Sequence, residues 1–337
     1  MLVVASKRSE DGSVTEPIFL AFLRIFSTHS LMENMKNKPK RVLITGCSSG
    51  FGFLTALDAA REGFDVIATM RNPDKFAPLQ EAADRKNLKL TIDRLDITEP
   101  DSITEIAEKH KPIDILVNNA GILITGSFLT QTEEEMRRIF ETNYFGAVNL
   151  TRAVVPSMIE RRMGRIINIA SLAGLVGHPY NAAYAASKHA LIGFSKSIRV
   201  ELAPFGINVV SIEPGYHKTE IIGLNGNLSE NFYDRSSPMF EWNRGMLRVM
   251  FDIVLPRAGE PQAVANEIVA ALCHEKPPRH IVVGKEAKLA MIGRWLGLMG
   301  WLEYRAGKMI RKARRLENKR EAEKKNRRKQ KKAQAQS

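Results

Sequence analysis

The stretch RVLITGCSSGFG, residues 41–52, places a short apolar run directly before a glycine-rich turn with the spacing T-G-x-x-x-G-x-G. The run has the composition of a buried strand, and the segment after Gly52 has the length of a helix. Gly46 suits a tight turn, Gly50 lets the backbone approach a pyrophosphate, and Gly52 lets helix and strand pack closely. Because the amino end of a helix favours negative charge, the pattern predicts a dinucleotide site. The residues predicted to bind the dinucleotide here are Gly46, Ser48, Ser49, Gly50, Phe51 and Gly52.

Outward from this turn, short apolar runs alternate with segments of helical length over residues 38–284. We predict strands at 41–45, 65–70, 88–95, 113–117, 165–170, 207–212 and 280–283. Helices are expected at 53–62, 102–110, 133–160, 183–203 and 262–274. Strands that alternate with helices form βαβ units, so the prediction is a single doubly wound α/β (Rossmann) domain whose parallel sheet of seven strands is covered on both faces.

Composition and charge exclude several classes of protein. The chain has 337 residues, of which 44% are apolar and 26% charged, which excludes a collagen or a wholly disordered chain. Its net charge of +13 is concentrated in residues 308–337, where 14 Lys and Arg against three Glu give +11 and leave +2 for the rest. The body therefore has no basic surface for nucleic acid. Two cysteines, Cys47 and Cys273, cannot build a disulfide framework or a thiolate zinc site, so we expect a cytoplasmic protein without a metal.

Both ends of the chain lie outside the predicted domain. Residues 1–36 contain an apolar run at 17–26 that is too short to span a bilayer and that follows acidic residues, unlike a signal peptide. We expect a disordered extension or a start codon placed too early, with an amphipathic anchor as the alternative. At the other end, the apolar segment 287–304 with two Trp precedes the basic tail 308–332. This composition is typical of a peripheral segment on an anionic membrane surface; the alternative is packing onto the body or a partner subunit, with a solvated tail.

Polar residues at the ends of the central strands predict how the cofactor is held. The second strand ends at Arg71 and offers no carboxylate for a ribose hydroxyl, which favours NADP(H) over NAD(H). Asp96 follows the third strand and is placed to reach the adenine edge. The fourth strand ends in Asn118-Asn119-Ala120-Gly121, and polar groups and a Gly at this position line the ligand crevice of such a sheet. Asn118, Ala120 and Gly121 are therefore candidate cofactor contacts.

Four residues predict acid–base chemistry. Tyr184 and Lys188 lie at i and i+4, on one face of a predicted helix. A phenol has an ordinary pKa of about 10, and a nearby cation lowers it, so Tyr184 could exchange a proton with an alcohol or a carbonyl. Ser171 ends a strand and could hydrogen-bond the substrate oxygen. Asn143 lies inside the predicted helix 133–160, where Asn is mildly unfavourable.

Together these motifs resemble the short-chain dehydrogenase/reductase family over residues 38–284. The resemblance implies a Rossmann sheet with strand order 3-2-1-4-5-6-7 and an NAD(P)-dependent enzyme acting on CH–OH groups. It implies that Tyr184 is the acid/base, that Lys188 binds the nicotinamide ribose and lowers the tyrosine pKa, and that Ser171 orients the substrate. Asn143 would hold a water in the proton relay. Residues 213–215 with Thr219 resemble the family's segment beside the nicotinamide, which adds Pro214, Gly215 and Thr219 as cofactor contacts.

The segments TGCSSGFG and ATMRNPDK resemble the 17β-hydroxysteroid and retinol dehydrogenase-like branch, whose members act on lipophilic alcohols and ketones and many of which prefer NADP. The family also implies a homo-oligomer, with residues 133–160 and 183–203 at the interface. Segment 219–260 is rich in Met, aromatic and aliphatic residues, among them Ile222 and Leu224. We expect it either to cover the substrate pocket or to pack on itself and on the subunit interface. Segments 122–128 and 172–180 should form the other walls, with His178 as a surface loop residue near the mouth.

The alternatives to an oxidoreductase are a non-catalytic dinucleotide-binding regulator with a basic membrane- or nucleic-acid-binding tail, and an epimerase or dehydratase, whose larger substrate domain is missing.

Overall fold

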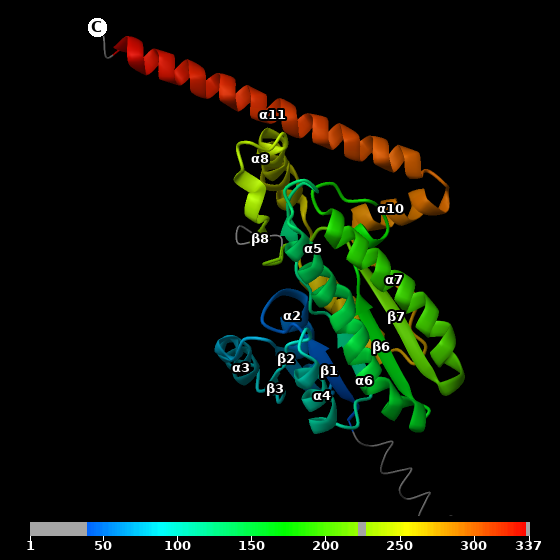
Figure 1. Ribbon diagram of the computed structural model, residues 1–337. Helices are drawn as coiled ribbons and strands as arrows, with labels where there is room; N and C mark the ends of the chain where they lie inside the picture. Colours follow the sequence, from blue (N-terminus) through cyan, green and yellow to red (C-terminus); the bar gives the residue numbers. More distant parts are fainter. Residues whose placement is uncertain (1–38, 222–226, 335–337) are drawn as a thin grey trace, which may run out of the picture. The chain divides into compact units, whose positions relative to one another are not determined.

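The computed structural model describes residues 39–221 and 227–334, within a compact unit that runs from Arg41 to Ser337. Its centre is one parallel sheet of seven strands in the order β3-β2-β1-β4-β6-β7-β9, which confirms the predicted order (Figure 1). Residues 1–36, with their predicted apolar run, lie outside the described residues, and the predicted domain boundaries stay predictions. The strands are β1 Arg41–Thr45, β2 Asp65–Met70, β3 Thr91–Arg94, β4 Ile115–Asn118, β6 Gly164–Ile169, β7 Ile207–Pro214 and β9 His280–Val283.

The sheet has helices on both faces. On one face α2 Gly50–Arg61, α3 Phe76–Arg85 and α9 Gln262–Cys273 pack with the strands into one apolar core. On the other face α4 Pro100–Lys109, α6 Gly146–Glu160 and α7 Ala182–Leu202 supply the second core. The central strands β1, β4 and β6 are buried almost throughout because each is covered on both sides.

The predicted helix 133–160 is interrupted. The chain forms α5 Glu133–Phe140, then a π-helical turn Glu141–Phe145, then α6. A capping box between Thr132 and Glu135 fixes the start of α5. The π turn contains Asn143, the residue that the sequence marked as unusual inside a helix, and its extra backbone residue changes the direction in which that side chain projects.

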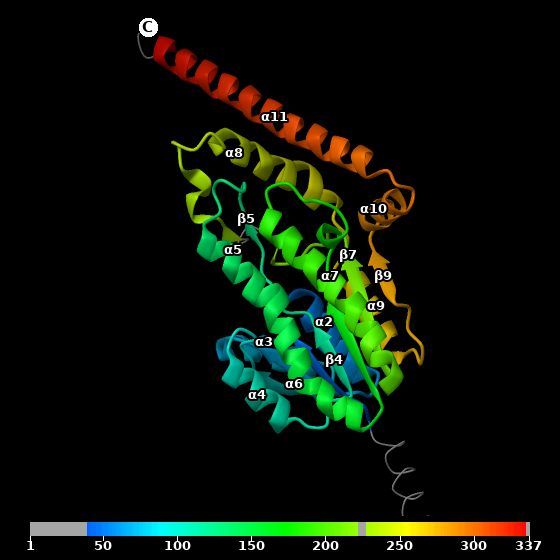
Figure 2. The same ribbon diagram turned by 45° about the vertical axis from the view of Figure 1, so that its right-hand side comes forward.

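The carboxyl ends of the strands are covered by segments from the second half of the chain. A two-stranded sheet joins β5 Ile124–Thr125 to β8 Asn227–Leu228. It is followed by α8 Phe240–Arg248, a π-helical turn Val249–Val254, α10 Lys285–Trp295 and α11 Met299–Gln334. Short 3₁₀ turns lie at Pro73–Lys75, Leu172–Gly174, Ala203–Phe205, Glu230–Tyr233 and Leu255–Arg257. In both ribbon views α8, α10 and α11 lie beyond the end toward which the strands point (Figures 1 and 2).

The C-terminal region, predicted as an apolar helix 287–304 followed by a basic tail, forms two helices in this structure, α10 and α11. The helix breaks at Gly297, whose φ of 71° lies in the left-handed region, and the basic residues continue α11 rather than forming a separate tail. Met309, Ile310 and Leu316 of α11 pack against an apolar cluster that includes Tyr180, Met246 and Val249. The first half of the basic segment is therefore part of the packed structure.

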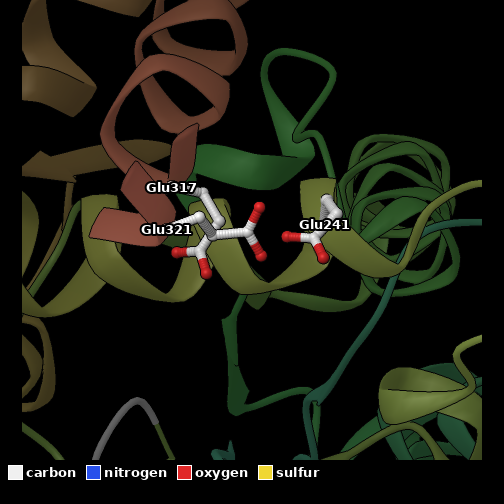
Figure 3. Close-up of side chains that lie close together, drawn as sticks. All are labelled: Glu241, Glu317 and Glu321. Carbon is white, nitrogen blue, oxygen red and sulfur yellow. The ribbon is translucent and has the colours of Figure 1, made fainter. Parts of the chain in front are cut away.

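Ion pairs fasten α11 to α8. Glu317 of α11 is fully buried, and its two carboxylate oxygens lie 2.7 Å from Nη2 of Arg244 and 2.6 Å from Nε of Arg248. The Glu241 and Glu321 side chains lie close to Glu317 (Figure 3), and a carboxylate oxygen of each lies 3.6 Å from Nη1 of Arg244. The three carboxylates are thus neutralised by arginines, and we call this cluster the α8–α11 clasp.

Candidate active site

The glycine turn after β1 is held by backbone contacts that exclude side chains. A Cβ on Gly46, whose φ is 72°, would lie 2.8 Å from Cα of Ala120, and a Cβ on Gly52 would lie 2.4 Å from the oxygen of Gly46. Both approaches are closer than real Cβ contacts, so glycine is required at each. Nδ2 of Asn119 donates to the oxygens of Thr45 (2.8 Å) and Gly46 (3.1 Å) and ties the turn to the end of β4.

The two asparagines at the end of β4 have different surroundings. Asn118, a predicted cofactor contact, has a buried amide that donates to Oγ1 of Thr151 (3.0 Å) and Oδ1 of Asn168 (2.8 Å), so it braces β4 against its neighbours. Asn119, which the sequence analysis did not select, faces the crevice and the glycine turn. The Asn118-Asn119 pair was the feature of the sequence that indicated a polar crevice residue. The alternation of side chains along the strand does not determine which of the two asparagines points into the crevice.

A crevice of about 400 Å³ opens above the glycine turn at the carboxyl ends of the strands. This volume lies within the range of about 300–1,000 Å³ for cofactor and ligand pockets. Twelve of the predicted cofactor residues line it: Gly46, Ser48, Ser49, Gly50, Phe51, Arg71, Asp96, Ala120, Gly121, Tyr184, Lys188 and Thr219. Pro214 and Gly215 line an adjoining smaller cavity together with Thr219. The glycine cradle and the elongated crevice fit a dinucleotide.

The adenosine end of this crevice has a basic rim. The Arg71 side chain is 73% exposed, and its Nε lies 3.9 Å from Oδ2 of Asp96. The Asp96 carboxylate accepts hydrogen bonds from the backbone N and Oγ1 of Thr98, at 2.9 and 2.7 Å. Lys75 lines the same crevice, a basic residue that the sequence analysis did not select. Arg71 is thus free to turn toward an anionic group.

Tyr184 and Lys188 lie on successive turns of α7, with Nζ of Lys188 5.8 Å from the centre of the Tyr184 ring. Nζ donates to the oxygen of Ile169 at 2.8 Å, at the end of β6. Burial lowers the pKa of Lys188 to about 8, so the side chain is mostly cationic at neutral pH. Burial also raises the pKa of Tyr184, while the Ser171 hydroxyl opposes that rise. The net direction of the tyrosine pKa in this structure is upward, where the sequence had predicted a lowering by Lys188.

Asn143 connects the crevice wall to α7. Its Oδ1 accepts from the backbone N of Ile122 (2.7 Å), and its Nδ2 donates to the oxygen of Ile122 (2.9 Å) and to Oγ of Ser187 (3.2 Å). A Cβ on Gly121 would lie 3.1 Å from Oδ1 of Asn143 and 3.5 Å from Nζ of Lys188. The π turn thus brings Asn143 close to Lys188. Ser171 caps the next 3₁₀ turn by accepting from the N of Ala173 at 3.1 Å.

A smaller cavity of about 70 Å³, here called the catalytic cavity, lies beside Ser171 and Tyr184. Its other walls include Phe51, Leu123, Leu172, His178, Tyr216, Ile221 and Met250. The structure places His178 in a loop, with its side chain partly exposed. Its Nε2 lies 2.7 Å from the hydroxyl of Tyr216, and burial lowers its pKa. Tyr216 covers it from a different loop, a contact that local sequence does not reveal.

Segment 219–260 contributes to this cavity at only a few points. Ile221 and Met250 line it, whereas Phe232, Met246 and Val249 are buried within the segment's own packing. Ile222 and Leu224 lie outside the described residues. Both expectations for this segment are therefore partly met, because a short part closes the cavity and the larger part packs on itself and on α11.

Comparison with known proteins agrees with this arrangement. The family model described as short chain dehydrogenase matches residues 40–226. The chain is 39% identical over 266 residues to the uncharacterized oxidoreductase YusZ of Bacillus subtilis, covering 76% of this chain and 93% of that protein. It is 36% identical to retinol dehydrogenase 8 of Bos taurus, covering 72% and 81%. Among solved structures, a short-chain dehydrogenase from Sphingobium yanoikuyae in complex with NADPH superposes with a TM-score of 0.61 at 26% identity, covering 78% and 94%.

Proposed function

The chain belongs to the short-chain dehydrogenase/reductase family, and we propose that it is an NADP(H)-preferring member that acts on a lipophilic alcohol or carbonyl compound. As a family member it is an NAD(P)-dependent oxidoreductase that interconverts an alcohol with its ketone or aldehyde. The observation that carries the proposal is the position of Tyr184, which lines both the dinucleotide crevice and the catalytic cavity. Nothing in the comparisons favours the alternative of a non-catalytic regulator.

We assign the proton chemistry to this chain's own residues. The Tyr184 hydroxyl gives a proton to the substrate oxygen in reduction and takes it back in oxidation, and Ser171 holds the same oxygen. The Lys188 cation favours the phenolate form of Tyr184 at the moment of transfer. Asn143 fixes Ile122 and Ser187 and is proposed to hold a water in the proton path. When bound, the nicotinamide dinucleotide supplies or accepts the hydride.

The preference for NADP(H) rests on the basic rim of the crevice. Arg71 and Lys75 both line it near the end of β2, where a 2′-phosphate would add negative charge. The Asp96 carboxylate lies beside Arg71, and its Oδ1 accepts two hydrogen bonds from Thr98. Asp96 follows β3 rather than β2, so β2 itself ends in a cation and not in a carboxylate for the ribose hydroxyl.

A lipophilic substrate is supported by the walls of the catalytic cavity. Phe51, Leu123, Leu172, Ile221 and Met250 are apolar. The polar side chains of the lining are Ser171, His178, Asn181, Tyr184, Tyr216, His217 and Thr219. Such a lining orients one oxygen and leaves the remainder of the ligand in apolar surroundings. The name of retinol dehydrogenase 8 gives a lipophilic alcohol for that relative.

We also propose that α10 and the start of α11 bind an anionic membrane surface. Ile292, Trp295, Leu296, Leu298 and Trp301 are exposed, and the Trp295 side chain is the most exposed of them at 85%. A contiguous apolar patch of this kind marks an interaction site. On α11 the patch adjoins basic side chains that stack on its aromatic rings, with Arg305 on Trp301 and Lys308 and Arg311 on Tyr304.

Aromatic rings flanked by Lys and Arg suit the headgroup region of an anionic bilayer. Across residues 39–221 and 227–334, no helix is both long and apolar enough to cross one. Flotation with anionic liposomes tests surface binding: Trp295→Ala combined with Leu298→Ala should lose binding, and Met163→Ala, which removes an exposed apolar side chain elsewhere, should keep it. Equal flotation of both proteins would contradict the proposal.

A homo-oligomer formed through α5, α6 and α7 also remains a proposal. Phe145 and Val200, on these helical segments, are exposed apolar residues that a partner subunit would cover. Light scattering behind size-exclusion chromatography measures the mass directly. A monomer at micromolar concentration would contradict it. Cytoplasmic location stays a prediction from the sequence.

The reaction itself is tested by NADPH oxidation at 340 nm against ketones and aldehydes graded by chain length, with NADH in parallel. We expect faster turnover with NADPH and a rate that rises with the apolar surface of the carbonyl compound. Cofactor binding is followed separately by tryptophan fluorescence. Tight NADPH binding with no turnover of any compound in the series would contradict the proposed substrate class, and a preference for NADH would contradict the role of the basic rim.

A further inference from the structure

A second hollow, here called the α11 cavity, lies beneath the C-terminal helix and has a volume of about 410 Å³. Its lining is apolar apart from Ser127 and His178, and comes from several places in the chain. The loops after β5 and before α7 supply Phe128, Pro179 and Tyr180, α8 and the residue before it supply Trp242 and Met239, and α11 supplies Ile310. None of these residues has a role in the proton chemistry proposed above.

The catalytic cavity is too small for a lipophilic molecule of ordinary size. At about 10–15 Å³ for each water-sized group, its volume of about 70 Å³ has room for roughly five such groups. That is enough for the carbonyl carbon and its immediate neighbours. The rest of a long apolar substrate would extend beyond this cavity, and the size and lining of the α11 cavity suit that part.

The two cavities share a wall. His178 lines both, Asn181 lines the catalytic cavity, and Ala182 lines the α11 cavity. The segment between them is held in place: the oxygen of Tyr180 accepts from the N of Gly126 at 2.9 Å, and Tyr180 itself has a φ of 65°, an uncommon value for an aromatic residue. His178 therefore lies at the boundary between the catalytic cavity and the α11 cavity.

The roof of the α11 cavity lies outside residues 40–226, the part of the chain that the family model matches. Ile310 is held over the cavity because Met309, Leu316 and the α8–α11 clasp fix α11 against α8. Trp242 lies on α8 beneath the same helix, with the Arg314 guanidinium 5.6 Å from its ring centre. The roof is a property of this chain's C-terminal region.

We propose that the α11 cavity binds the apolar tail of an elongated substrate whose oxygen-bearing carbon lies at Ser171 and Tyr184 and whose chain passes His178. This inference rests on the proposed function, because it takes the catalytic cavity as the site of the reacting carbon. The ligand class is a long-chain alkyl or polyene alcohol, or its aldehyde or ketone.

Binding is tested without turnover. The neutral apolar dye N-phenyl-1-naphthylamine is titrated into the full chain, and decanal and butanal compete for it. We expect decanal to displace the dye at far lower concentration than butanal. Ile310→Asp, which places a charge in the roof, should weaken dye binding at least tenfold, whereas Asn326→Asp, which adds the same charge at an exposed position of α11, should not. Dye binding equal in both variants would overturn the proposal.

Turnover gives the second test, and a second variant guards against loss of folding. In the unaltered chain kcat/KM should rise up to about fourfold for each methylene added to an n-alkyl aldehyde. Ile310→Trp, which fills the cavity without a charge, should flatten this rise for long chains and leave short aldehydes unaffected. A slope that Ile310→Trp does not change would overturn the tail site. Absence of turnover with every aldehyde, including the shortest, would instead contradict the proposed function, while the dye titration still decides on the cavity.

Discussion

Replacing Lys188 by Met should make the protein more stable at neutral pH while abolishing its activity. The Lys188 side chain is buried, and its pKa falls from 10.5 to about 8. At about 1.4 kcal/mol per pKa unit, the cation at pH 7 costs about 3 kcal/mol of folding free energy. The substitution also removes the donor to the oxygen of Ile169, worth about 1 kcal/mol. The net gain is about 2 kcal/mol, or roughly 4–8 °C in Tm.

The pH dependence of this gain has a definite sign. Between pH 8 and 10.5 the unfolded chain keeps the Lys188 proton while the folded chain has lost it, so the stability of the unaltered protein rises with pH. The advantage of Lys188→Met should therefore shrink across this interval and reverse above it, where only the lost hydrogen bond remains. Lys196→Met, at an exposed position of the same helix, serves as the control and should change Tm little at any pH.

Urea unfolding at pH 7 and at pH 10 measures both proteins, with NADPH oxidation as the activity assay. Lys188→Met that is less stable than the unaltered chain at pH 7 would refute the reasoning, because it would mean that the buried cation is stabilised by contacts that the structure does not contain. An advantage that does not change with pH would refute the assignment of the gain to the charge.

Tyr184→Phe should leave NADPH binding nearly unchanged, since the ring stays in place, and should reduce kcat by several orders of magnitude; turnover close to that of the unaltered chain would remove Tyr184 as the acid/base. Arg71→Asp should shift the ratio of kcat/KM for NADPH over NADH toward NADH by at least tenfold, and Arg85→Asp on α3 should not; an unchanged ratio would exclude a contact with the 2′-phosphate. Glu317→Ala should lower the free energy of unfolding by roughly 3 kcal/mol, because it removes the buried carboxylate that pairs with both Arg244 and Arg248 and leaves Arg244 with its longer contacts to Glu241 and Glu321. Glu323→Ala, at an exposed position of α11, is the control in urea unfolding, and equal midpoints for the two would contradict the clasp.

The sequence predicted the central sheet well because strands that are buried on both faces consist of uninterrupted apolar residues, which are easy to recognise. β1 and β9 were predicted at the residues where they occur. The prediction was poorest at β3, expected over 88–95 and formed only by Thr91–Arg94, because this edge strand is partly exposed and its limits depend on pairing with β2. α3, β5, β8 and α8 were not predicted, since short or mixed segments give no clear period.

The candidate site was predictable where its residues follow a fixed spacing along one element. Tyr184 and Lys188 share one face of α7, and the glycine turn follows β1 directly, so local sequence sufficed. The surroundings of His178 depend on Tyr216 and those of Glu317 on Arg244, pairs that are distant in the chain. The pKa of Tyr184 was expected to fall because the neighbouring cation was visible in the sequence and the burial was not.

The strand order has a consequence for how the protein forms during synthesis. The glycine turn after the first strand is complete only when Ala120 has packed against Gly46 and Thr219 lies beside Gly50. Every strand pair in the main sheet is parallel, so each contact waits for a long crossover to close. On a ribosome the first half of the chain emerges with the glycine turn, Arg71 and Asp96 but without Tyr184, Lys188 and Thr219, so one wall of the crevice is still absent. The complete crevice, and the full stabilisation that a bound dinucleotide can give, therefore form only after most of the chain has been translated.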